Sequence, residues 1–183
     1  MYKENTFPKN FIWGVATSSY QIEGAPTVGG KGPSVWDTFS HSPGKIKNND
    51  NGDIACNHYE LWPEDIAIMK ELGINAYRFS ISWPRIFPTG SESKPNQSGL
   101  DFYSKLVDAL LENNITPFIT LNHWDIPQGL EDNGGWPNRE IVNEFVKYSY
   151  HTSKHLGDRV KFWITHNEPW CVSYLGYVIG RKP

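Results

Sequence analysis

One pattern recurs along the chain and limits the folds that it can adopt: a short apolar run, then polar residues, then a segment with helical periodicity. The apolar runs are residues 11–16, 75–81, 115–121 and 161–165. Their short length and their β-branched and aromatic content predict buried strands. Apolar residues three and four apart predict helices, and a further helix is expected at the end: 58–72, 99–112, 138–155 and 174–180. The connecting segments are expected to be loops: 25–57, 86–98 and 128–137.

Alternating strands and helices form a parallel sheet, which leaves a doubly wound sheet and a (β/α) barrel as the two candidate folds. No G-x-G-x-x-G turn follows the first apolar run, so the main sign of a dinucleotide-binding doubly wound fold is missing. Polar residues with functional potential are instead associated with every run: Gln21, Arg78, His123, Asn167 and Glu168. Strands of a TIM barrel all present residues at one face, so the sequence predicts a TIM-type barrel.

The end of the fourth run carries the strongest candidate for a catalytic group. Pro169 disfavours a helical conformation for the residue before it and fits the first turn of a helix. Glu168 is therefore expected on the turn between a strand and a helix. A carboxylate there, between the amide of Asn167 and the ring of Trp170, is suited to proton transfer to a sugar. A single glutamate in such a place is more often a solvated loop residue than a catalytic one. The polar residues at the other strand ends are what favour the catalytic interpretation.

Each of the other candidates has a plain structural alternative. His123, Gln21 and Asn167 are expected to bind sugar hydroxyls. Equally, His123 could be a core imidazole with its hydrogen bonds satisfied, Gln21 an ordinary loop residue and Asn167 a helix cap. Arg78 lies within an apolar strand and needs a partner if it is buried. It could form a structural ion pair, or its charge could keep a catalytic carboxylate ionised.

Composition excludes several classes of function. The net charge of −3 is too balanced for a nucleic acid or an anionic membrane as partner. The start, MYKENTFPKN, has no apolar core of a signal peptide, no window spans a membrane, and the two cysteines lie far apart, so a cytoplasmic protein is expected. His151 and His155 are four residues apart, but Thr152 rules out an H-E-x-x-H zinc site. Neither a metal nor a cofactor is expected.

Aromatic residues make up 14% of the chain and include eight tryptophans. Several of these rings precede polar or proline residues, as in Trp124-Asp125, which places them at strand ends and in loops. Such rings are platforms for flat apolar surfaces, and a pyranose has one.

Five segments together resemble glycoside hydrolase family 1, the family of β-glucosidases, 6-phospho-β-glucosidases and plant myrosinases. In chain order they are FIWG (11–14), SYQIEG (19–24), YRFSISWPR (77–85), HWDIP (123–127) and NEP (167–169). They occur in the order of the family and cover the chain from Phe7 onwards. The resemblance implies a (β/α)₈ barrel and retaining hydrolysis of β-glucosides.

The resemblance also implies a role for each candidate residue. Glu168 matches the acid/base of the family, and its identity argues against the myrosinases, which carry glutamine there. Arg78 matches the arginine beside the nucleophile. The matches to ligands of the sugar and to the wall of the sugar site are Gln21, His123, Asn167 and Trp124.

The chain departs from the family pattern in one important respect. No segment matches the Thr/Glu-Asn-Gly context of the nucleophile on the seventh strand of the family. The expectation is therefore a single domain over residues 1–183 that holds the first four βα units, a half barrel. By itself it would be inactive, because retention needs two carboxylates about 5–5.5 Å apart. The alternative is a catalytically silent half barrel that binds sugar, self-associates, or pairs with a C-terminal half through open sheet edges.

Overall fold

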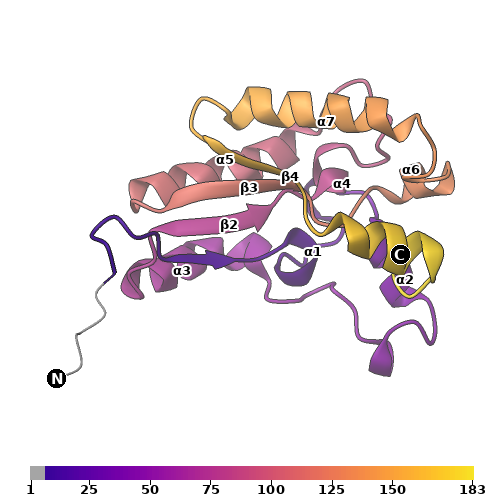
Figure 1. The fold of residues 1–183 in the computed structure, drawn as a ribbon, viewed down its shortest axis with the longest axis horizontal. Coiled ribbons are helices and arrows are strands. Elements are labelled where there is room, and N and C mark those ends of the chain that lie inside the picture. Colours follow the sequence, from indigo (N-terminus) through magenta and orange to yellow (C-terminus); the bar gives the residue numbers. More distant parts are fainter. Residues whose placement is uncertain (1–6) are drawn as a thin grey trace.

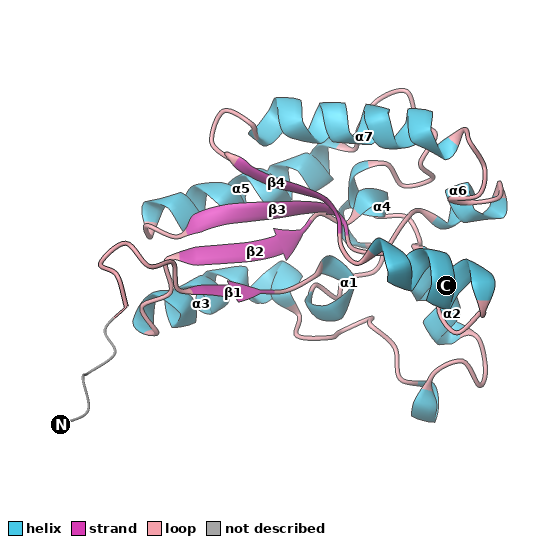
Figure 2. Ribbon diagram, in the orientation of Figure 1, coloured by secondary structure: helices cyan, strands magenta, loops and turns pink. Residues whose placement is uncertain are grey.

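The computed structural model describes residues 7–183 and contains one parallel sheet, of four strands in sequence order. The strands are β1 (Gly14–Ala16), β2 (Ala76–Ser80), β3 (Thr116–Asn122) and β4 (Phe162–His166). Each strand pairs only with its neighbours in the sequence (Figures 1 and 2). This is the first half of a (β/α)₈ barrel, and it confirms the predicted fold class.

Three long helices cover one side of the sheet: α3 (His58–Glu71), α5 (Gln97–Glu112) and α7 (Ile141–Leu156) (Figure 2). Side chains alternate between the two faces of a strand. Tyr77, Phe79 and Ile119 therefore belong to the buried core under the helices. Arg78 and Phe118, which pair in register, lie on the opposite face, where the ring of Phe118 stacks on Phe162 at 4.3 Å.

The first strand is shorter than predicted. Only Gly14–Ala16 joins the sheet. The backbone N–H of Phe11 donates to the carbonyl of Pro8 at 2.9 Å, which closes a turn just before the strand. Trp13, the residue before the strand, is still held next to β2. Its backbone N–H donates to Oδ1 of Asn75, the residue that precedes β2, at 2.8 Å.

The segments between the predicted strands and long helices contain short helices that apolar spacing could not reveal. These are α1 (Ser19–Ile22), η1 (Val28–Gly30), α2 (Val35–His41), η2 (Lys47–Asn49), α4 (Trp83–Ile86) and α6 (Gln128–Asp132). A capping box starts α2: Ser34 Oγ accepts from the backbone N–H of Asp37, whose carboxylate accepts from the backbone N–H of Ser34. The S-x-x-D spacing is a known start signal, so α2 could have been predicted.

The last two helices begin elsewhere than expected. Helix α7 begins at Ile141 rather than directly after Asn138, which starts a turn before the helix: its Oδ1 accepts from the backbone N–H of Glu140 at 3.1 Å, and its Nδ2 donates to the carbonyl of Asn133 at 2.7 Å. The final helix, η3, spans Cys171–Val178 and is a π-helix. It starts soon after Pro169, with the first backbone bond from Cys171 N–H to the carbonyl of Glu168. Within residues 7–183, no helix is long and apolar enough to span a membrane.

Candidate active site

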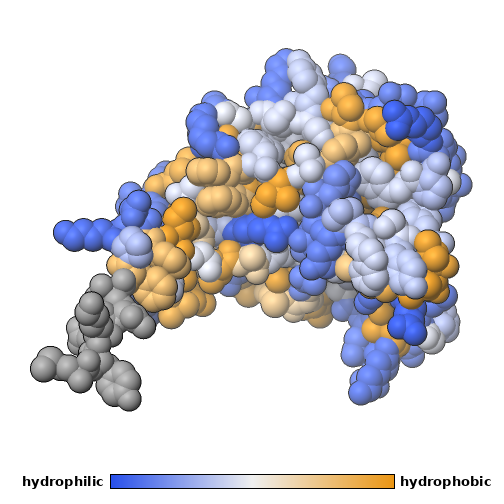
Figure 3. All heavy atoms as spheres, in the orientation of Figure 1, coloured by the Kyte–Doolittle hydropathy of each residue, from blue (hydrophilic) through white to orange (hydrophobic). Residues whose placement is uncertain are grey.

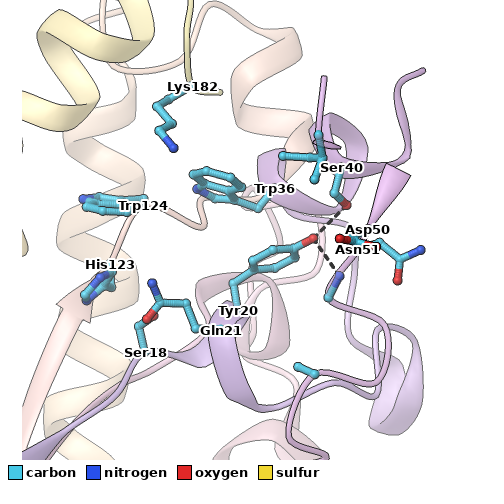
Figure 4. A pocket seen from close by; sticks show the side chains of 13 residues that line it. Ser18, Tyr20, Gln21, Trp36, Ser40, Asp50, Asn51, His123, Trp124 and Lys182 are labelled. Atoms are coloured by element: carbon cyan, nitrogen blue, oxygen red, sulfur yellow. Dashed lines mark hydrogen bonds between the residues drawn. The ribbon is translucent and has the colours of Figure 1, made fainter. Parts of the chain in front are cut away.

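The sequence-predicted residues gather at the carboxyl edge of the sheet. One residue lies within β2, and the others follow β1, β3 and β4: Arg78, Gln21, His123, Trp124, Asn167 and Glu168. A pocket of about 390 Å³ opens beside them. Gln21, His123 and Trp124 line it, together with the rings of Tyr20 and Trp36 (Figure 4).

Asn167 connects three strands through its side chain and backbone. Its Oδ1 accepts from Arg78 Nη2 at 2.6 Å, and its Nδ2 lies 3.1 Å from His123 Nε2. Its carbonyl accepts from the indole N–H of Trp124 at 2.9 Å, and its backbone N–H donates to the carbonyl of Asn122. Asn167 is only 9% exposed. The cluster therefore fixes the positions of four predicted site residues relative to one another.

Arg78 brings a positive charge to the inner face of the sheet. Besides Asn167, it donates from Nε to Thr120 Oγ1 at 3.0 Å. Among residues 7–183, no carboxylate pairs with it. A guanidinium whose described partners are all neutral can still attract a carboxylate from elsewhere.

The environment keeps His123 uncharged. Burial is the largest cause and the charge of Arg78 the next, and together they lower the pKa of His123 to about 4, against a smaller opposing effect of Glu168. In the neutral ring, Nε2 accepts from the amide of Asn167, so Nδ1 carries the proton and is the nitrogen that can donate a hydrogen bond. This suits hydroxyl groups better than an anion.

Glu168 lies at the exposed rim of the site. Its Oε2 accepts from Cys171 Sγ at 3.2 Å. Its backbone adopts φ +42°, in the left-handed region, and Trp124 at the end of β3 has φ +81°. Such conformations are uncommon for residues other than glycine, and cluster at functional sites. Neither residue type favours this conformation, so the sequence carried no signal for it.

Of the residues that the sequence predicts at the sugar site, Gln21 and His123 line this pocket. Asn167 and Glu168 do not line it. The amide of Asn167 is hydrogen-bonded to Arg78 and lies 3.1 Å from His123 Nε2, next to the pocket. Glu168 instead follows the left-handed turn out to the rim.

Several residues of the pocket were not predicted from the sequence. Trp36, in α2, stacks on Trp124 with ring centroids 6.3 Å apart, and Lys182 Nζ lies 5.4 Å from the Trp36 ring (Figure 4). Tyr20 donates from its hydroxyl to Ser40 at 2.7 Å, which ties α1 to α2. The recognisable start of α2 was the available signal for Trp36.

A buried polar network supports α1, the helix that carries Gln21. Arg85 is fully buried and donates to Glu23 Oε2 from Nε and Nη2, while its guanidinium lies 4.2 Å from the ring of Tyr59. Ser19 donates to Asp125 Oδ2 at 2.6 Å. Burial raises the pKa of Asp125 to about 7.

Within residues 7–183, no group of three or more His, Cys, Asp or Glu side chains is arranged to hold a metal ion. The described site is thus built from a neutral imidazole, amides, a guanidinium, aromatic rings and the exposed carboxylates of Glu168 and Asp50.

Comparison with known proteins gives one consistent result. β-Glucosidase A of Acetivibrio thermocellus is 60% identical over 175 residues, which are 96% of this chain and 39% of that protein. β-Glucosidase A of Thermotoga maritima is 58% identical over 174 residues, 95% of this chain and 39% of that protein. The solved family 1 β-glucosidase of T. maritima superposes with a TM-score of 0.93 at 57% identity, over 96% of this chain and 39% of that one.

The chain thus spans about two fifths of the length of these relatives. Another solved structure at the same TM-score and identity is the T. maritima β-glucosidase in complex with castanospermine. Residues 3–183 match the profile of glycosyl hydrolase family 1. With its half-barrel fold and these matches, the chain belongs to glycosyl hydrolase family 1.

Proposed function

We propose that the complete protein is a retaining β-glycosidase that acts on β-glucosides, and that Glu168 is its acid/base. The observation that carries this proposal is the cluster around Asn167, which joins Arg78, His123 and Trp124 directly beside an exposed carboxylate. The similarity to proteins named β-glucosidase supports the substrate class.

Each residue then has a role that follows from its chemistry. Glu168 donates a proton to the departing glycosidic oxygen and later takes one from the attacking water. Gln21, His123 and Asn167 exchange hydrogen bonds with sugar hydroxyls, and the ring of Trp124 packs against the sugar. Because His123 is neutral at neutral pH, it does so without introducing a charge that would repel the developing positive charge of the sugar.

The nucleophile is expected outside these 183 residues. Retention requires a second carboxylate about 5–5.5 Å from the acid/base. Asp125 is close in sequence to His123, but it is buried and bound to Ser19 rather than open to the pocket. Arg78, without a carboxylate partner among the described residues, is suited to keep an incoming one ionised.

A second function is favoured by the open inner face of the sheet. Phe162 is 47% exposed although it stacks on Phe118, and β1 and β4 each pair on one side only. Hydrophobic residues gather over the left part of the sheet (Figure 3). Such a face and such edges favour association. The chain by itself could therefore be a silent half barrel that binds sugar or associates with itself.

Hydrolysis of an aryl β-glucoside separates the two functions. The 183-residue chain alone should show no turnover above background, and addition of the remaining part of the protein should restore it. In the completed enzyme, Glu168→Gln should slow substrates with poor leaving groups by about 10²–10⁴-fold. The control is Glu112→Gln, at the exposed end of α5, which should leave the rate unchanged.

Aryl substrates with acidic leaving groups should suffer less from Glu168→Gln at the first step, since they need less help from a proton. Hydrolysis by the chain alone that Glu168→Gln does not affect would contradict both the assigned site and the need for a second half.

A further inference from the structure

A second pocket, of about 430 Å³, lies at the carboxyl ends of β3 and β4, whose last residues, Asn122 and His166, line it. Asn122 lines this second pocket, whereas the next residues, His123 and Trp124, line the candidate active site. The two pockets share no lining residue. Its size falls within the range of small-molecule sites. We propose that the second pocket binds a small, neutral aromatic alcohol.

The wall of the second pocket is largely aromatic and is held in place. Trp136 and Tyr177 line it, and the backbone N–H of Trp136 donates to the Tyr177 hydroxyl at 3.1 Å. That hydroxyl donates in turn to the carboxylate of Glu131. Pro137, Pro169 and Val172 complete the apolar lining. A wall tied together across loop and helix presents a preformed surface for a flat apolar ligand.

His166 supplies the polar contact. Its ring meets Trp136 edge to face, at a centroid distance of 4.9 Å. Its Nδ1 lies 3.2 Å from Asn122 Nδ2, and Asn122 is only 1% exposed, so the imidazole is held from behind. Its Nε2 has no hydrogen-bond partner in the part of the chain that the structure describes. Burial lowers the pKa of His166, so the ring is neutral at neutral pH.

The remaining polar group of the lining is Ser173, whose hydroxyl makes one long contact of 3.5 Å with the carbonyl of Trp170. A ligand hydroxyl can both donate and accept, so one such group can satisfy His166 and Ser173 together. A sugar would leave most of its hydroxyls facing apolar walls, which is costly. An anion would find no lysine or arginine among the described lining residues. These groups together select an apolar ring with a single hydroxyl.

Titration of the full chain with benzyl alcohol, followed by calorimetry, tests the proposal. We expect saturable binding with a single site, and no binding of benzoate, which has the same ring but a negative charge. His166→Phe keeps the ring and removes the polar contact, and should weaken binding about threefold to tenfold. Gln21→Ala, in the active-site pocket, should leave the affinity unchanged and serves as the matched control.

Ser173→Phe provides an independent variant, because Ser173 is exposed on η3 and a larger ring there fills the second pocket without disturbing the core. It should abolish binding while the circular dichroism spectrum stays that of the unmodified chain. The proposal is overturned if benzyl alcohol shows no saturable binding. It is equally overturned if Gln21→Ala removes the binding while Ser173→Phe leaves it intact.

Discussion

Arg78 Nη2 and Asn167 Oδ1 are 2.6 Å apart, although 89 residues of sequence separate them. This contact joins β2 to the residue beside Glu168 and sets the amide of Asn167 toward His123. One guanidinium thus serves two purposes. It orients a residue of the candidate site, and its charge lowers the pKa of a neighbouring imidazole.

The titration of His123 should therefore respond to the charge at position 78. Arg78→Met removes a positive charge that disfavours the protonated imidazole, so the pKa of His123 should rise from about 4 while burial keeps it below 6.5. Proton NMR titration measures this directly. His166 is an internal control, because burial alone lowers its pKa and Arg78 takes no part. If the pKa of His123 is unchanged in the variant, burial alone accounts for its low value.

Asp125 should make folding less favourable as the pH rises. Its pKa is raised by burial from 3.8 to about 7, so the folded state binds a proton that the unfolded state has already lost between these values. The contribution of the neutral carboxyl is complete below about pH 4 and is lost as the pH rises through about 7. Asp125→Asn cannot ionise, so its stability relative to the unmodified chain should increase over this range.

Urea unfolding at several pH values measures that difference. His123 acts in the opposite direction, since its lowered pKa removes stability as the pH falls from 6.5 to about 4. Its contribution cancels when Asp125→Asn is compared with the unmodified chain at each pH. A constant difference between the two proteins would mean that Asp125 is ionised in the fold throughout.

Glu168 should be replaceable by glycine with a gain in stability. Its φ of +42° is strained for a residue with a Cβ, whereas glycine adopts it freely. Glu168→Gly should raise the free energy of unfolding by about 1 kcal/mol while removing the proposed acid/base. Thr165→Gly, three residues earlier in β4, is the control and should lower it. Destabilisation by Glu168→Gly would show that contacts of the side chain outweigh the strain.

The buried pair of Glu23 and Arg85 should be costly to break. Arg85 is fully buried, so Glu23→Gln leaves a guanidinium in the core without its charged partner. The expected loss is about 3–5 kcal/mol in the free energy of unfolding. The more exposed pair of Arg159 and Asp108 provides the contrast: Asp108→Asn should cost no more than about 1 kcal/mol. Equal losses in urea unfolding would contradict the distinction between the two environments.

The sequence predicted the strands and long helices because burial on one face leaves a periodic record in the chain. Tyr77 and Phe79 alternate with Arg78. This alternation predicted the strand and identified Arg78 as a charged residue within an otherwise apolar run. The pattern of apolar residues does not predict features that depend on single contacts. No pattern marks the left-handed backbone of Glu168, nor the turn between Asn138 and the start of α7 at Ile141.

The sequence also predicted which residues belong to the candidate site, but not how their side chains contact one another. Polar residues after apolar runs identified Gln21, His123 and Asn167 as neighbours. Their mutual hydrogen bonds were beyond the sequence, and so was the position of Glu168 outside the pocket, since both depend on where side chains meet across strands. The roles assigned to these residues stay predictions until the variants are measured.

The order of the strands in the sheet has a consequence for how the protein is made. Since each strand pairs with the one synthesised just before it, every pairing partner is already present when a new strand leaves the ribosome. Each pairing spans a single crossover connection, so none of the described pairings has to wait for a strand that is made later. The site can then be assembled in the order of synthesis. Arg78 is placed with β2 and His123 after β3, and Asn167, which is made last, then contacts both of them.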